Sequence, residues 1–206
     1  MEWKDITIRK YQELYPILTR KLSTVSDELD QQIDILVCLN GKSVDYYDSL
    51  TRKQFNMLTD YYSFLSTPPT QGQPKRMFKL HGYVFEMDYN SKNINDRLTG
   101  RDIIELTRLA GNEELVTMNM HKIIDAYTTV RKKWFRVPKI DKAEVLLDLD
   151  IQTAINITSF FLPLLEQYLL AIQTYLTATL QKENKKMEQE IANQKKKATG
   201  KGGGGK

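Results

Sequence analysis

The longest regular pattern of apolar residues runs from Asp150 to Leu180, and Glu166 is its one charged residue after Asp150. Its apolar side chains recur every three or four residues, the spacing that places them on one face of a helix. One stripe contains Ile157, Phe161, Leu164, Tyr168, Ile172 and Tyr175, and a second contains Phe160, Leu165, Leu169, Leu176 and Leu180. Two adjacent stripes make a broad apolar face, so this pattern predicts a long helix that protein largely covers.

A membrane-spanning helix is the alternative interpretation of the same stretch, because a span needs about 20 mostly apolar residues. Polar residues interrupt this one, namely Asn156, Thr158, Ser159, Glu166, Gln167, Gln173 and Thr174. We therefore expect a core or interface helix and no membrane span. Pro163 lacks a backbone donor, so it is expected either to kink the helix or to mark a helix start.

Shorter stretches with helical spacing lie on both sides of a central segment that lacks it. Most follow a residue whose side chain can cap the first turn of a helix by accepting a backbone hydrogen bond. The predicted starts are Thr7, Ser26, Ser43, Thr51, Thr99 and Asp141, and a further helix is predicted over residues 118–130. Residues 3–8 are expected to be extended, and Gly41 and Gly111 are expected to end two of the helices.

The central segment has the period of a β-strand. Apolar and polar residues alternate from Tyr83 to Met87, and Met77, Phe78 and Leu80 precede His81-Gly82. This pattern predicts a β-hairpin within residues 75–89 that turns at His81-Gly82. A lone hairpin is marginally stable, so it must pack on the helices or on another chain. The predicted fold is mainly α, a helical bundle with one small β-hairpin and a disordered basic C-terminal tail.

The charge of the chain is unevenly distributed. The formal net charge is +4, but residues 191–206 contain five lysines and no acid, which leaves −1 for residues 1–190. The predicted regions are therefore an N-terminal helical region (1–66), a linker and hairpin (67–98), a helical region with the long helix (99–190) and a disordered Lys/Gly tail (191–206). Only the tail has the charge of a polyanion-binding segment, and its candidate contacts are Lys195, Lys196, Lys197, Lys201 and Lys206.

Candidate catalytic and metal-binding residues are few. His121 has no second His or Cys at ligand spacing, His81 serves the predicted turn, and Cys38 reads most simply as a small buried hydrophobic residue. Asp148 and Asp150 are possible ligands of a divalent ion, but a helix cap explains Asp150 without a metal. Residues 131–136 are basic and aromatic, a composition that can grip phosphates or stack on bases. The alternative is a solvated basic edge of the fold, and we favour this alternative. We expect no enzyme activity, no cofactor and no metal.

Several short motifs follow one another in an order that resembles a known family. They are Trp3-Lys-Asp-Ile-Thr-Ile8, Ile35-Leu-Val-Cys-Leu-Asn-Gly41, Phe78-Lys-Leu-His-Gly-Tyr-Val-Phe85, Leu98-Thr99-Gly100, Met118-Asn-Met-His-Lys-Ile123 and Ser159-Phe-Phe-Leu162. This order is similar to tail-assembly-chaperone-like proteins of tailed bacteriophages of Bacteroidetes, including crAss-like phages. The resemblance covers residues 1–180, and the basic Gly-Lys tail departs from the chaperone pattern.

The resemblance implies a non-enzymatic virion protein, packaged as cargo in the tail or capsid and delivered with the genome. Its expected partners are other phage virion proteins and copies of itself, with non-specific DNA contact through the tail. It would lie in the virion interior, and in the host cytoplasm during assembly. The alternative is a tail-assembly chaperone that is absent from the mature virion. A small DNA-modifying or host-takeover enzyme is a third possibility, but it needs an active site, and the residues do not suggest one.

The lysine tail generates the first testable prediction. The full chain should bind short duplex DNA without sequence preference, and its affinity should fall steeply with added salt because lysines displace counterions from phosphates. Deleting residues 191–206 should abolish this binding and leave the rest of the chain folded. Fluorescence anisotropy with a labelled duplex measures both proteins, and equal affinities would contradict the prediction.

Overall fold

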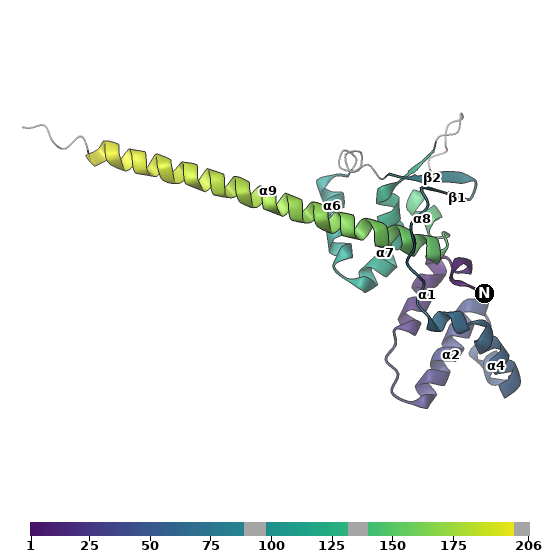
Figure 1. Ribbon diagram of the computed structural model, residues 1–206. Coiled ribbons are helices and arrows are strands. Elements are labelled where there is room, and N and C mark those ends of the chain that lie inside the picture. The colour runs from purple at the N-terminus through teal and green to yellow at the C-terminus, as the bar shows by residue number, and fades with distance from the viewer. Residues whose placement is uncertain (89–97, 132–139, 200–206) are drawn as a thin grey trace, which may run out of the picture. The chain divides into compact units, whose positions relative to one another are not determined.

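A computed structural model describes residues 1–88, 98–131 and 140–199 of the chain (Figure 1). From residue 188 to 199, and at several positions between 168 and 179, it describes the backbone alone. The chain forms two compact units, Met1–Leu162 and Pro163–Lys206. Helices make up most of the described chain and one small antiparallel sheet completes it, which confirms the mainly α prediction.

The N-terminal part of the first unit is helical. Its elements are η1 (Trp3–Asp5), α1 (Ile8–Leu18), α2 (Val25–Asn40), α3 (Val44–Asp48), α4 (Arg52–Tyr61) and η2 (Ser63–Ser66). The predicted cap Thr7 accepts a hydrogen bond from the Lys10 amide, and Thr51 forms a reciprocal capping box with Gln54. Gly41 ends α2 with φ of 66°, a left-handed conformation that suits glycine.

Two predictions in this part were wrong. Thr24, not Ser26, caps α2, because the Asp27 carboxylate accepts from the Thr24 amide at 2.8 Å while Thr24 Oγ1 accepts from the Asp27 amide at 3.1 Å. This capping box needs an acid three residues after the cap, and Thr24 has one in Asp27. The segment predicted to be extended over residues 3–8 begins with a short 3₁₀ helix, Trp3–Asp5, and is extended at Ile6 and Thr7.

The predicted hairpin is present and turns where expected. Strands β1 (Met77–Leu80) and β2 (Tyr83–Met87) pair antiparallel around His81-Gly82. His81 and Gly82 have φ of 47° and 79°, and two positive values in a row are what a tight two-residue hairpin turn requires.

A third strand, β3 (Thr128–Val130), lies against β2 and corrects the helix predicted over residues 118–130. The observed helix α7 (Glu113–Tyr127) begins earlier, at an Asn112 cap, and ends at Tyr127. Thr128, Thr129 and Val130 are β-branched, so they suit a strand once the open edge of β2 offers backbone partners. A strand three residues long has too short a pattern to be recognised in the sequence.

The remaining helices are α6 (Gly100–Ala110), α8 (Lys142–Leu146) and α9 (Ile151–Thr199). Thr99 and Asp141 cap α6 and α8 as predicted, and Asp150 Oδ1 accepts from the Thr153 amide at 2.8 Å at the start of α9. The helix α9 continues through Pro163 to Thr199. The disordered tail was predicted to begin at residue 191, but the backbone is helical to Thr199, so the prediction was wrong for residues 191–199, and residues 200–206 fall outside the described residues.

The main core of the first unit surrounds the first turns of α9. Ile151, Ala154, Ile157 and Phe161 are completely buried, and the Phe161 ring stacks on Tyr127 with centroids 4.2 Å apart. The N-terminal segment runs alongside, because Ile8 N donates to Leu149 O at 2.8 Å and Ile151 N donates to Ile6 O at 2.7 Å. These backbone bonds join residues that are more than 140 positions apart in the sequence.

A second, smaller core holds α2, α3 and α4 together. Its buried side chains are Ile33, Leu36, Tyr47 and Tyr62. Both tyrosine hydroxyls have a partner: Tyr47 donates to Leu36 O at 3.0 Å and Tyr62 donates to Asn40 Oδ1 at 2.6 Å. We call residues 24–66, which form this part of the molecule, the α2–α4 lobe.

Replacement of Phe161 by Ala should reduce the free energy of unfolding by about 3–5 kcal/mol, because it removes a fully buried aromatic ring and leaves a cavity against Tyr127. Ile104→Ala on α6 is the matched control, since Ile104 is 72% exposed, and it should change stability by less than about 0.5 kcal/mol. Urea denaturation followed by circular dichroism measures both. A Phe161→Ala protein as stable as the control would show that this core is misplaced.

Candidate functional site

The candidate polyanion-binding lysines lie at the end of α9 or beyond it. The backbone of Lys195, Lys196 and Lys197 is helical, and Lys201 and Lys206 fall outside the described residues. Their role therefore stays a prediction from the sequence. Of the basic and aromatic residues 131–136, Arg131 is described and the others fall outside the described chain.

Arg131 supports the edge of the sheet. Its Nε donates to Glu86 Oε2 at 2.9 Å, and Arg76 lies 3.3 Å from the other Glu86 oxygen. The hydrogen bond from Arg131, followed by the charges of both arginines, lowers the pKa of the Glu86 carboxyl. Arg131 thus pairs with an acid at the edge of the sheet, and the edge role favoured for the whole of residues 131–136 stays a prediction.

The two acids considered as metal ligands have separate structural roles. Asp148 Oδ2 lies 2.9 Å from His81 Nε2 at the hairpin turn, and Asp148 Oδ1 lies 3.6 Å from Arg9. Asp150 instead caps α9. Within the described residues, no three His, Cys, Asp or Glu side chains gather closely enough to hold a metal ion.

Cys38 is half-buried beside a polar pair. Its thiol lies 3.9 Å from Glu13 Oε2, and that carboxylate accepts from Lys10 at 2.6 Å. Burial is the main cause that raises the pKa of the Cys38 thiol. A thiol that stays protonated at neutral pH is a poor nucleophile, so the geometry favours the packing role predicted for it.

His121 joins α7 to α1 through Gln12. The Gln12 amide donates to Met118 O at 2.9 Å and lies 3.3 Å from His121 Nδ1. With Nδ1 as the acceptor, the ring proton of neutral His121 is on Nε2. Burial, as the largest cause, lowers the pKa of His121, so the neutral ring is the stable form in the fold.

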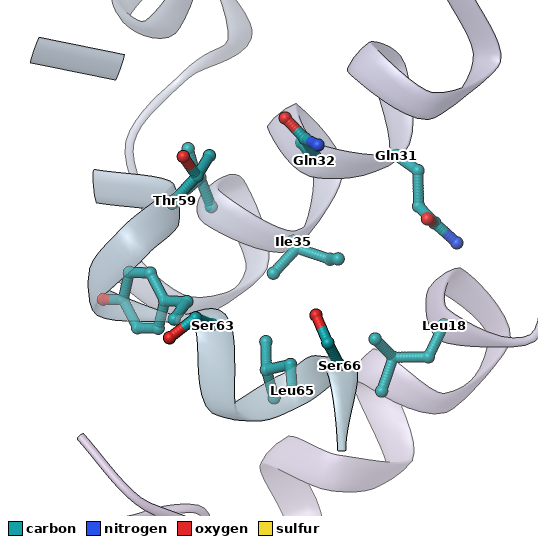
Figure 2. Close-up of a pocket in the computed structure, with 10 residues that line it drawn as sticks. Leu18, Gln31, Gln32, Ile35, Thr59, Ser63, Leu65 and Ser66 are labelled. Atoms are coloured by element: carbon teal, nitrogen blue, oxygen red, sulfur yellow. The ribbon is translucent and has the colours of Figure 1, made fainter. Parts of the chain in front are cut away.

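A pocket of about 310 Å³ opens in the α2–α4 lobe beside the end of α1, and sequence reasoning did not anticipate it (Figure 2). Its lining is Leu18, Gln31, Gln32, Ile35, Leu36, Thr59, Tyr62, Ser63, Leu65 and Ser66. Figure 2 shows Ile35 on one side of the hollow, with Leu65 and Ser66 across from it. The walls carry apolar groups, hydroxyls and amides but no charge, so the pocket suits an uncharged apolar side chain or small neutral group.

A second hollow, of about 350 Å³, lies between α6 and α7. Two of its three acidic side chains have structural partners. Asp102 completes the capping box with Thr99, and the Lys142 ammonium lies 2.5 Å from Asp125 Oδ1. Glu105 and Lys122 line it as well, so this hollow is charged, unlike the pocket in the α2–α4 lobe.

The second unit exposes large apolar side chains at its described positions. Leu170 is 63% exposed and Leu180 is 60% exposed, and Leu164 and Met187 are exposed as well. The sequence predicted a helix largely covered by protein. The chain itself buries Ile157, Phe161 and Leu165 of the two predicted stripes, but Phe160, Leu164 and Leu180 are exposed, so the prediction was wrong for these positions of the single chain. None of the helices within the described part of the chain combines the length and the hydrophobicity that a bilayer crossing requires.

Comparison with protein-family models, with curated protein sequences and with solved structures finds no match to this chain in any of the three. Its function must therefore be inferred from its own residues.

The depressed pKa of His121 predicts a pH-dependent stability. The unfolded chain binds a proton near the ordinary pKa of about 6.5, and the folded chain binds it only at lower pH. The contribution of His121 is therefore present above pH 6.5 and is lost as the pH falls below that value. His121→Asn keeps an acceptor for Gln12 but does not titrate, so its stability should fall less between pH 7.5 and 5. Urea unfolding of both proteins at each pH measures the difference, and parallel curves would contradict it.

Proposed function

We propose that this chain is a non-enzymatic bacteriophage virion protein, packaged as cargo in the tail or capsid and delivered with the genome. The observation that carries the proposal is the second unit. It is a single helix in which most of the described large apolar side chains, including Leu170 and Leu180, are exposed, and Leu165 is the buried exception among them. Several large exposed apolar side chains on one helix are consistent with a site where another protein packs. Association with other proteins is thus the activity that this part of the chain supports best.

The contacts of the chemically capable side chains support a packing role. Cys38 is half-buried beside Glu13, His121 links two helices through Gln12, and His81 pairs with Asp148 at a turn. Each of these residue types performs catalysis in other proteins when it faces a substrate pocket. Here none of these side chains lines the 310 Å³ pocket.

The basic end of the chain supports storage beside nucleic acid. Five lysines and no acid within residues 191–206 give a cationic segment that is attracted to phosphates, while residues 1–190 carry −1. The order of the sequence motifs resembles that of tail-assembly-chaperone-like phage proteins. This resemblance supports a phage particle as the place where such storage occurs. The cargo interpretation combines these two observations.

A tail-assembly chaperone is the second candidate, and the exposed leucines of α9 favour it equally, because a chaperone covers an apolar surface of its partner. The lysines of residues 191–206 distinguish the cargo from the chaperone, because a chaperone that shields an apolar surface does not require a cation-rich segment. The candidates also differ in a measurable way, because cargo stays in the finished particle and a chaperone leaves before it is complete.

Quantitative mass spectrometry of purified virions, before and after triggered genome release, tests the proposal. We expect the protein in intact virions at many copies and its loss from emptied particles together with the DNA. The major capsid protein, which remains in both samples, is the internal control. Absence from intact virions would select the chaperone, and an equal amount in emptied particles would show a fixed structural subunit that is not delivered.

A further inference from the structure

The α2–α4 lobe is acidic although the chain as a whole is basic. It contains seven acids and three bases, a net charge of −4. The acids are Asp27, Glu28, Asp30, Asp34, Asp45, Asp48 and Asp60, and the bases are Lys42, Arg52 and Lys53. Asp34 pairs with Arg20 at 2.8 Å and Asp27 belongs to a capping box, whereas the other five acids are exposed. This lobe therefore attracts a cationic partner.

The same lobe offers apolar contact area. Val25 is 81% exposed and Leu29 is 49% exposed on α2, one turn apart and therefore on one face of that helix. On α4, Met57 is 65% exposed and Tyr61 is 56% exposed. The uncharged pocket opens between these two helices, and Asp30 and Asp60 are each next in sequence to a residue that lines it. A partner that fits must therefore be cationic and must also carry apolar anchors.

The end of α9 combines positive charge with exposed apolar side chains. Residues 180–199, which we call the α9 end, contain six lysines and three glutamates, a net charge of +3, and Lys201 and Lys206 raise it to +5. Among the described side chains, Lys182, Lys185 and Lys186 are exposed. Leu180 and Met187 are exposed too, and their spacing of seven residues puts them two turns apart on one helix face. Methionine is flexible enough to fill an irregular pocket.

We propose that the α2–α4 lobe of one copy of this protein binds the α9 end of a second copy. The lysines would lie along the exposed carboxylates, and Leu180 and Met187 would pack on the exposed apolar residues and into the pocket between α2 and α4. This is recognition of an amphipathic helix by a groove, guided by opposite charge. DNA is a poorer occupant of the lobe, because its phosphates would face the acids.

The two surfaces are different, so the contact is head-to-tail and repeats from copy to copy into a string or a ring. The inference rests on the proposed function in one respect, that many copies are held together in one particle. The contact itself requires no particle, and purified protein tests it. Its failure would therefore leave the virion proposal intact, and absence from virions would leave the contact intact.

Charge reversal on each surface provides the test. The lobe variant carries Asp30→Lys and Asp60→Lys, and the helix variant carries Lys182→Glu, Lys185→Glu and Lys186→Glu. Both sets are exposed positions on helices and none is a capping residue, so both proteins should fold. The control, Glu105→Lys with Glu114→Lys, makes the same charge change as the lobe variant at exposed positions outside the lobe.

Sedimentation velocity over a range of protein concentrations, with nucleic acid removed, gives the result. The wild-type and control proteins should associate, and each variant alone should show a dissociation constant at least about tenfold higher. An equimolar mixture of the two variants should recover association between unlike copies, because the unchanged acidic lobe of the helix variant then meets the unchanged basic α9 end of the lobe variant. Added salt should weaken wild-type association, since the charges are exposed.

Three outcomes would overturn the inference. A wild-type protein that stays monomeric at every concentration lacks the contact. Association of the lobe variant at wild-type strength would show that the copies pair through other surfaces, such as α9 with α9. Association that appears only after short duplex DNA is added would show that the α9 end binds nucleic acid and not the lobe. Circular dichroism of each variant confirms its helical content, so that a loss of association is not mistaken for unfolding.

Discussion

The first three turns of α9 fix the organisation of the first unit. Ile151, Ala154, Ile157 and Phe161 face its core at intervals of three or four residues, and the Tyr127 ring stacks on Phe161. The backbone bonds between Ile6 and Ile151 and between Ile8 and Leu149 attach the N-terminal segment to the same place. Contacts between such distant residues gain their energy only after a long loop has closed, so most of the remaining fold must form before or with them.

Local signals predicted much of this fold, and the failures have physical reasons. Thr7, Thr51, Thr99 and Asp150 cap helices because side-chain caps depend on residues within one turn. The turn at His81-Gly82 was recognisable for the same reason. Strand β3 was not, because Thr128–Val130 becomes a strand through the edge of β2, more than 40 residues earlier. The error at Ser26 came from overlooking Asp27, the acid that completes the box with Thr24.

The candidate surfaces were harder to predict than the fold. The pocket unites Leu18, Gln31 and Ser66, which no short pattern connects, and its walls consist of residue types that are common on any helix. The acids of the lobe are visible in the sequence, but the net charge summed over a long stretch does not reveal that they cluster. Residues 1–190 carry −1 as a whole, and only the boundaries of α2 and α4 show that seven of the acids belong to one compact lobe.

Segregated charge determines how two copies would approach each other in the contact that we propose. Like charges keep two lobes apart and two α9 ends apart, whereas a lobe and an α9 end attract each other, so electrostatics selects one mode of approach among several. Surface ion pairs contribute little free energy, typically about 0–1 kcal/mol each. The exposed apolar side chains Leu180, Met187 and Met57 must therefore supply most of any lasting affinity, with charge setting the orientation and the rate of encounter. Such a contact would be most populated where the protein is concentrated and would dissociate on dilution, which agrees with the proposed role as packaged and later released cargo.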